Sequence, residues 1–193
     1  MSAGCAALAG ALFLGRRIQQ EETPANIPFV ILGTGLLWFG WFGFNAGSAF
    51  SAGTDAVLAF ANTNLASATA MITWIFFDRY RDRRMSAVGA CIGAVVGLVA
   101  ITPAAGFVSL GDSLLIGFIA SLISNVCIDV FHKTGRVDDT LDVFASHGVG
   151  GMVGMVLTGV FAAEIGLTSG ETETFVKHLV ALLGVAVGAF GLS

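Results

Sequence analysis

Residues 138–163 read DDTLDVFASHGVGGMVGMVLTGVFAA, with one histidine, His147, inside a run that is apolar from Val143 onward. A helix that starts at Asp142, where the side-chain oxygen can cap free backbone N–H groups, has about 20 residues before Glu164. That length is enough to cross a bilayer. The stretch therefore predicts a membrane-spanning helix with a titratable ring inside it.

A helical projection divides this predicted helix into two faces. The face of His147 also carries Phe144, Gly150, Gly151, Gly154 and Thr158. The opposite face carries Val149, Met152, Val153, Val156 and Val160. Small residues let another helix approach closely, so His147 is expected on the packed face. Its ring is either a hydrogen-bonding group between helices or a functional group, because titratable residues inside a membrane are functional candidates by default.

The composition places the chain among polytopic membrane proteins. Of the 193 residues, 55% are hydrophobic and only 11% are charged, with 26 glycines, and the mean hydropathy is +0.86. Such a chain has too little polar surface for a soluble globule, so the predicted fold is an all-α membrane bundle. No basic patch indicates nucleic-acid binding.

The cysteines and the charges indicate no metal site or cofactor. Cys5, Cys91 and Cys127 fall in three different apolar segments, with no CxxC or Cys/His cluster, and are expected to be buried packing thiols. A membrane enzyme using His147 as a general base would need a partner group, and no HExxH, GxSxG or Cys/His pattern is present. We therefore predict that the chain is not an enzyme.

Besides 142–163, the sequence has six apolar segments, at 1–14, 27–50, 56–77, 85–105, 113–131 and 175–192. The first is too short for a span, so we expect the chain to be a fragment that starts partway through a helix. In the fourth, Gly89, Gly93 and Gly97 form two overlapping GxxxG patterns that let backbones touch. Pro103 frees a backbone carbonyl, so either the helix ends there or another group satisfies that carbonyl.

Smaller features follow from the same segments. Asp112 is the predicted N-cap of the fifth segment. The polar residues of the third segment need hydrogen-bond partners on neighbouring helices; they are Asn62, Thr63, Asn64, Ser67, Thr69 and Thr73. The charge run at 78–84 is most simply a solvated loop, and His132 and His178 are expected at solvated helix ends.

The basic residues predict the orientation in the membrane. If the segments alternate in direction, the loops at 15–26, 78–85 and 132–141 lie on one side. These loops carry eight of the nine basic residues, namely Arg16, Arg17, Arg79, Arg81, Arg83, Arg84, Lys133 and Arg136. By the positive-inside rule this side is cytoplasmic, which places Ser48 at the outer side and Asp142 at the inner side.

Three motifs, in this order, resemble the ammonium transporter family, which includes methylammonium permeases and Rhesus proteins. They are GWFGFNAGS at 40–48, GACIGAVVG at 89–97 followed by Thr102-Pro103-Ala104, and DDTLDVFASHGVGG at 138–151. The resemblance implies a fragment of an eleven-transmembrane-helix bundle with inverted repeats, from the end of the fifth helix to part of the eleventh, with residues 1–193 as a partial ammonium transporter domain. It also implies a homotrimer in the plasma membrane, or in the inner membrane of a bacterium.

The resemblance also implies roles for particular residues. His147 resembles the second of two pore histidines, the first of which would precede Met1. Phe44 resembles one of two stacked phenyl rings at an outer gate, and Ser48 resembles the serine of an outer cation-recruitment site. Trp41 and Leu37 resemble lumen wall, and Asp142 resembles a structural carboxylate at a helix start.

The function implied is transport of ammonium or ammonia through a hydrophobic pore, with methylammonium as an analogue. An ammonium sensor or regulatory subunit is the alternative within the same family, and a cytoplasmic regulatory protein of the nitrogen-signalling type is a possible partner. Whether transport is electrogenic or neutral stays open.

Overall fold

The computed structural model describes residues 1–18, 24, 26–135 and 137–193, and every regular element in these residues is a helix. The all-α prediction is thereby confirmed. The α-helices are α1 (Ser2–Leu14), α2 (Ile27–Gly47), α3 (Thr54–Tyr80), α4 (Ala87–Ile101), α5 (Leu110–Thr134), α6 (Gly150–Phe161) and α7 (Glu173–Gly191). A π-helical segment, η1 (Phe144–Val149), runs directly into α6, and a short 3-10 helix, η2 (Leu167–Ser169), precedes α7.

Five stretches of helix are long and apolar enough to cross a membrane: α2, α3, α5, η1 with α6, and α7. The helices α1 and α4 are apolar but have only 13 and 15 residues. The span predicted at 85–105 thus contains a shorter helix than expected, because Pro103 has no N–H to continue it. Of the two alternatives at Pro103, the structure shows the helix end: α4 ends at Ile101, just before the proline, and a buried turn with Ala104 and Ala105 follows.

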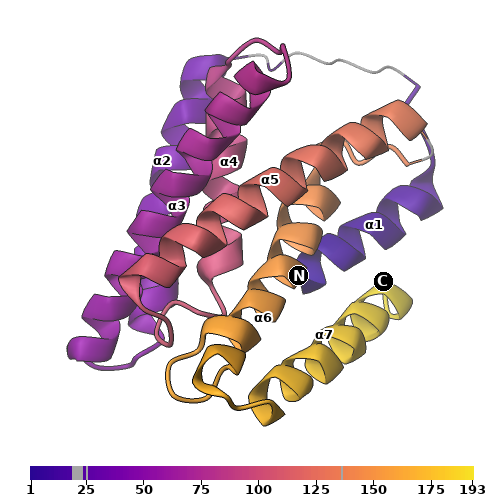
Figure 1. Ribbon diagram of the computed structural model, residues 1–193. Helices are drawn as coiled ribbons and strands as arrows, with labels where there is room; N and C mark the ends of the chain where they lie inside the picture. The colour runs from indigo at the N-terminus through magenta and orange to yellow at the C-terminus, as the bar shows by residue number, and fades with distance from the viewer. Residues whose placement is uncertain (19–23, 25, 136) are drawn as a thin grey trace.

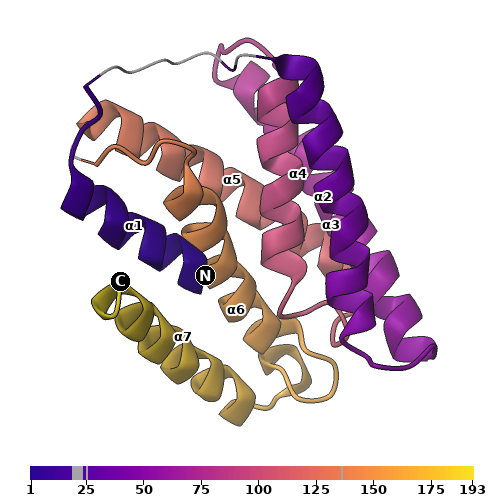
Figure 2. The same ribbon diagram turned by 180° about the vertical axis from the view of Figure 1, so that it is seen from behind.

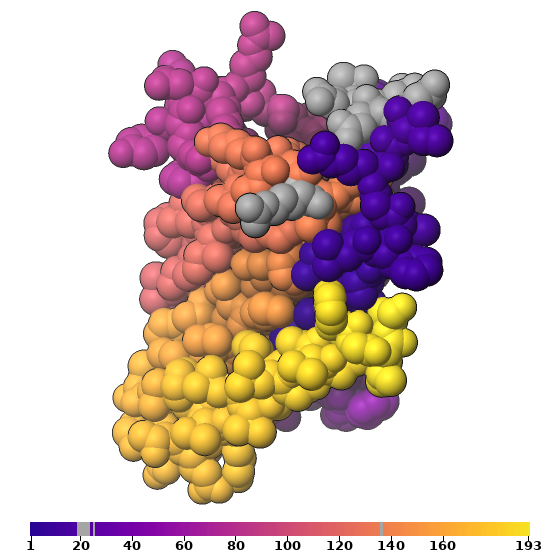
Figure 3. Space-filling view, turned by 90° about the vertical axis from the view of Figure 1, so that its right-hand side faces the viewer, coloured from indigo at the N-terminus to yellow at the C-terminus, as the bar shows by residue number. Residues whose placement is uncertain are grey.

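The core of the bundle lies between α3, α4 and α5 (Figures 1 and 2). Helix α2 packs on α3 and α4, while η1 and α6 pack on α4 and α5. On the far side of the bundle from α2, α7 runs beside α1 and contacts α6. The space-filling view shows α7 lying across this outer surface (Figure 3). The other helices thus surround a central layer formed by α3, α4 and α5.

The connections between helices gather at two ends of the molecule. The C-terminal end of α1, the turn between α3 and α4 and the segment between α5 and η1 lie at one end. The connections from α2 to α3, from α4 to α5 and from α6 to α7 lie at the opposite end (Figure 1). This alternation agrees with the predicted topology. The basic end holds seven of the described basic residues; the eighth residue of that prediction, Arg136, lies outside the described residues. We refer to the basic end as the inner end.

The glycines of α4 bring its backbone against α3, as the GxxxG patterns predicted. A Cβ atom added at Gly97 would lie 2.5 Å from the carbonyl oxygen of Ala66, and one at Gly93 would lie 3.0 Å from that of Ala70. Gly117 of α5 is similarly close to Ala66, at 2.3 Å. Helix α3 is therefore packed between two helices at backbone contact, a distance that only residues without a Cβ allow.

The polar residues of α3 find partners on its neighbours, as expected for polar groups inside a membrane. The Asn62 amide donates to the carbonyl oxygens of Ala105 and Val108, at 2.8 Å each. Ser67 donates to Ala94 O at 2.9 Å. The prediction holds for these residues, whereas Asn64 is exposed on this chain.

The N-cap predicted for α5 was wrong. Ser109, not Asp112, is the N-cap of α5; its hydroxyl accepts from Asp112 N, while the Asp112 carboxylate accepts from Ser109 N in a capping box. Helix α5 starts at Leu110, three residues before the expected start at residue 113, because Asp112 is the third residue of the helix and not its N-cap.

The charge run at 78–84 is more than a solvated loop. Asp78 is buried and accepts a 2.9 Å hydrogen bond from the Asn125 amide of α5. Arg81 and Arg83 both pair with Asp129, a buried residue near the inner end of α5. The run joins α3 to α5, because Asp129 lies inside the bundle and must be paired to remain charged there.

Candidate functional site

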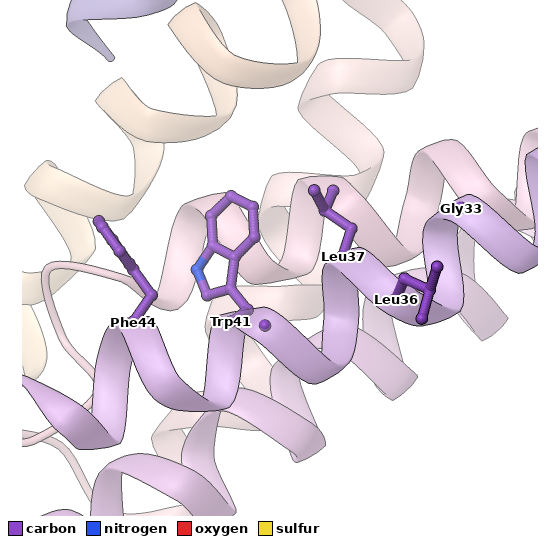
Figure 4. A pocket seen from close by; sticks show the side chains of 6 residues that line it. Gly33, Leu36, Leu37, Trp41 and Phe44 are labelled. Atoms are coloured by element: carbon purple, nitrogen blue, oxygen red, sulfur yellow. The ribbon is translucent and has the colours of Figure 1, made fainter.

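The predicted pathway residues of α2 lie along one groove. Leu37, Trp41 and Phe44 line a groove of about 550 Å³ together with Gly33, Leu36 and Gly40. In Figure 4 the side chains of Leu37, Trp41 and Phe44 project to the same side of the helix, at the spacing of one face. The Trp41 and Phe44 rings meet edge to face, with centroids 5.9 Å apart. The groove is therefore aromatic toward the outer end of α2.

Thr102 orients the Trp41 ring. The indole Nε1 donates to the Thr102 hydroxyl at 2.9 Å, and this hydroxyl donates in turn to Leu98 O at 2.8 Å. Both contacts come from the end of α4, where Pro103 interrupts the helix. The sequence marked Thr102-Pro103 as a helix end but gave no sign that its hydroxyl holds an aromatic ring on α2.

Ser48 lies at the C-cap of α2, about one helical turn beyond Phe44. Its hydroxyl donates to the Phe44 carbonyl oxygen at 2.7 Å, and the residue is exposed. Since the hydroxyl proton is already engaged, the oxygen lone pairs that face outward can accept hydrogen bonds from a donor such as a cation N–H. The residue stands at the outer end of the same helix as the groove.

His147 lies on η1 and lines a second cavity, of about 170 Å³. The walls of this cavity come from three other places: the inner half of α2, helix α4 and the segment before η1. The lining residues are Val30, Thr34, Val88, Cys91, Ile92, Val95, Leu141, Ser146 and His147. The predicted close packing of this face is confirmed, because Gly150, Gly151, Gly154 and Thr158 are all buried. His147 is therefore both within a packed face and open to a cavity.

The structure corrects the start of this helix. Asp142 was predicted to cap it, but the Phe144 N–H donates instead to Asp139 Oδ2, at 2.6 Å. Asp142 lies before the helix, with a left-handed φ of 52°, and the N-cap position is taken by Val143. Asp142 Oδ1 lies 2.8 Å from His132 Nε2 of α5, and burial raises the pKa of the Asp142 carboxyl while His132 opposes that rise.

Four of the six sequence-predicted residues thus line two cavities, both of which are bordered by α2. Leu37, Trp41 and Phe44 share the outer groove, with Ser48 beyond it, and His147 borders a cavity against the inner half of α2. Asp142 lies apart from both, in the segment before η1. Sequence reasoning missed Thr102 and Asp139, and only the DDxxD spacing ahead of His147 hinted at a role for Asp139.

Comparison with known proteins places this geometry in a family. The family model described as Ammonium Transporter Family matches residues 1–193. A putative ammonium transporter of Methanothermobacter thermautotrophicus is 43% identical over 98% of this chain and 49% of its own length, so the chain spans about half of that relative. The crystal structure of Candida albicans Mep2 superposes with a TM-score of 0.91, at 37% identity over 99% of this chain and 46% of that one.

A second solved structure, described as a Sensor Amt Protein, has a TM-score of 0.89 at 30% identity, over 98% of this chain and 49% of that one. The sequence match and the structural match therefore both extend over nearly the whole chain. The chain belongs to the ammonium transporter family.

Proposed function

We propose that this chain contributes one wall of a pathway that carries ammonium or ammonia across a membrane. The observation that carries the proposal is the arrangement along α2, where a polar outer end, an aromatic groove and a histidine-bordered cavity follow one another. In the proposed protein, residues 1–193 form the part from the end of the fifth to part of the eleventh transmembrane helix. We further propose a homotrimer in the plasma membrane, or in the inner membrane of a bacterium.

The proposed mechanism begins with selection by proton loss. Ammonium is close to potassium in size, so a site built only of charge and diameter would not separate them. Moving an ammonium-sized ion into a low-dielectric medium has an idealised cost of order 20 kcal/mol, which neutral ammonia largely avoids. Desolvation at the aromatic groove therefore lowers the ammonium pKa and favours proton release there.

The proposed roles follow from position. Ser48 accepts a hydrogen bond from the arriving cation, Phe44 closes the outer end, and Trp41 with Leu37 forms the apolar wall. His147 offers a neutral imidazole that can accept a hydrogen bond from ammonia or donate one, according to its tautomer.

The test is ammonium-evoked current, paired with internal pH, in liposomes that contain the full-length protein. Ammonium should produce a response that potassium does not, and methylammonium should produce a smaller one. Protein-free liposomes are the control. An equal response to ammonium and potassium at matched concentrations would contradict the proposal.

A sensor is the second candidate function, because a structure described as a Sensor Amt Protein is similar over 98% of this chain. A sensor would bind ammonium and engage a cytoplasmic regulatory protein without carrying flux. Saturable ammonium binding to purified protein, together with no flux in the liposome assay, would favour this function over transport.

Phe44→Ala is expected to change the outer gate with little effect on folding. The Phe44 side chain is 62% exposed on this chain, so its loss removes few internal contacts. We expect altered methylammonium uptake and weaker discrimination against potassium, with unchanged protein yield. Phe39→Ala is a suitable control, since Phe39 is also on α2 and 76% exposed but is not among the residues that line the groove. Uptake and selectivity equal to wild type would remove Phe44 from the gate.

Ser48→Ala is expected to weaken recruitment of the cation. The lost hydroxyl acceptor is worth about 1–3 kcal/mol where a charged ligand is left short of a hydrogen bond. The apparent affinity for ammonium should fall, while the maximal rate changes less. Ser51→Ala, in the exposed turn after α2, is the matched control. An unaltered half-saturating concentration in Ser48→Ala would exclude the serine from the site.

A further inference from the structure

Three carboxylates precede His147, and each binds a different part of the molecule. Asp139 accepts from Phe144 N, at the first turn of η1. Asp142 pairs with His132 of α5. Asp138 binds Arg17, which follows α1 and is 121 residues away in the chain. The segment that leads into η1 is therefore attached to η1 itself, to α5 and to α1.

The Arg17–Asp138 contact is the most extensive of the three. Arg17 Nη2 donates to Asp138 Oδ1 at 2.7 Å, Nε donates to Oδ2 at 2.9 Å, and the Arg17 backbone N–H also donates to Oδ2 at 2.9 Å. These hydrogen bonds lower the pKa of Asp138 to about 2, so the carboxylate stays ionised at neutral pH. A bidentate guanidinium–carboxylate pair has a defined geometry as well as strength. The contact therefore fixes the orientation of the Asp138 carboxylate relative to Arg17 as well as the distance between them.

Helix α1 also touches η1 directly, beside the histidine. A Cβ atom added at Gly4 would lie 2.1 Å from Gly148 N and 2.9 Å from the carbonyl carbon of His147. The two backbones are therefore in direct contact at the level of His147. Two contacts therefore link α1 to η1: Gly4 with Gly148, and Arg17 after α1 with Asp138 before η1. A displacement of Arg17 would change the position of η1 relative to α1.

The helix at His147 has π geometry over Phe144–Val149 and then continues as α6. A π-helical turn is rare and occurs frequently at functional sites, because it changes the direction of side chains relative to an α-helix. Such a turn needs support from its surroundings to persist. The three carboxylates that make these contacts lie in the segment directly before the π-helical residues.

We propose that Arg17 and Asp138 are positioning residues, whose ion pair holds η1 in place and so sets the direction of the His147 ring. This inference rests on the proposed function, in which His147 borders the pathway. The pair acts on the histidine through the backbone of the intervening segment and has no contact with the ligand in this scheme.

The test uses Asp138→Asn and Arg17→Lys in the full-length protein. Arg17→Lys keeps the charge but loses the bidentate fork, and it serves as the second variant if Asp138→Asn does not assemble. The matched control is Asp82→Asn, which breaks another inner-end ion pair, Arg79–Asp82, that is exposed on both sides and far along the chain from η1. Size-exclusion chromatography checks assembly for each variant.

The first measurement is independent of transport. In protein with ¹⁵N-labelled histidine, the imidazole signal of His147 is assigned by its loss in His147→Gln. We expect Asp138→Asn or Arg17→Lys to shift this signal and Asp82→Asn to leave it unchanged. A His147 signal identical to wild type in the assembled Arg17 and Asp138 variants would overturn the proposal.

The second measurement is the ammonium response in liposomes. We expect the maximal rate to fall at least about tenfold, since a misplaced group can reduce a rate by that much or more, with a smaller change in half-saturating concentration. The double charge reversal, Arg17→Asp with Asp138→Arg, should restore part of the loss. Wild-type rates in the assembled single variants would also overturn the proposal. If the wild-type protein itself carries no ammonium response, the proposed function fails, and the histidine signal still decides whether the pair positions His147.

Discussion

His147→Gln in the full-length protein is expected to abolish or alter the ammonium-evoked current while the protein still assembles. The amide can form hydrogen bonds but cannot titrate near neutral pH, so a proton relay or a tautomer-dependent contact is lost. If the ring only joined helices, the same change would preserve the current at a stability cost of about 1 kcal/mol. The measurement is current in liposomes together with size-exclusion chromatography.

His178→Gln provides the matched control for this experiment. His178 lies on α7 and is half-buried, and its Nδ1 is 3.1 Å from Met155 O. The His178→Gln variant thus removes a histidine that only packs between helices, and its ammonium-evoked current is expected to persist. A wild-type current from well-assembled His147→Gln protein would refute the relay, and loss of assembly would assign His147 to helix packing.

Gly97→Leu is expected to prevent formation of the bundle. The first side-chain atom would lie 2.5 Å from Ala66 O and 2.6 Å from the Ser67 Cα, both parts of the α3 backbone. Neither atom can move aside as a side chain could, so α3 and α4 must separate, at a cost of about 3 kcal/mol or more. The readouts are the yield of monodisperse protein and its thermal unfolding temperature.

The control for this variant is Gly111→Leu, near the start of α5. An added Cβ at Gly111 meets only the Ser109 hydroxyl, at 3.7 Å. The same change in volume and helix propensity is thus made where space exists, and yield should remain close to wild type. Equal yield and melting temperature for Gly97→Leu and Gly111→Leu would show that the α3–α4 contact is looser than the geometry indicates.

The apolar segments and their direction could be predicted because both depend on short stretches of the chain. The length of an apolar run shows directly whether it can cross a bilayer, and the segment at 27–50 is long enough. The basic residues of the loops add an independent sign of direction. Glycines spaced four apart on α4, such as Gly93 and Gly97, likewise indicate a close contact before its partner helix is known.

The site could be predicted in part for a related reason. Phe44, Trp41 and Leu37 share a face of one helix by their spacing, but only the family resemblance pointed to a pathway, and the groove that they line is seen only in the structure. The apolar run around it marked His147 as a candidate, the family resemblance added Ser48, and the roles of both remain predictions. The cavity at His147 could not be foreseen, because its walls come from α2, α4 and η1, which are far apart in the chain.

Hydrophobic length and residue size act locally, so the sequence was enough to predict a helical membrane bundle, most of its long apolar helices and the close contacts made by the glycines of α4 and by the His147 face, although the helix at 85–105 is shorter than expected. The partners of the charged groups became visible only in the folded molecule: Arg17 pairs with Asp138 across 121 positions, Arg81 and Arg83 pair with Asp129, and Asp139, not Asp142, accepts from the backbone at the start of η1. The physical reason is that a carboxylate inside or beside a membrane must take whatever donor the folded backbone brings within hydrogen-bond distance, and that distance is set by the packing of helices remote in sequence.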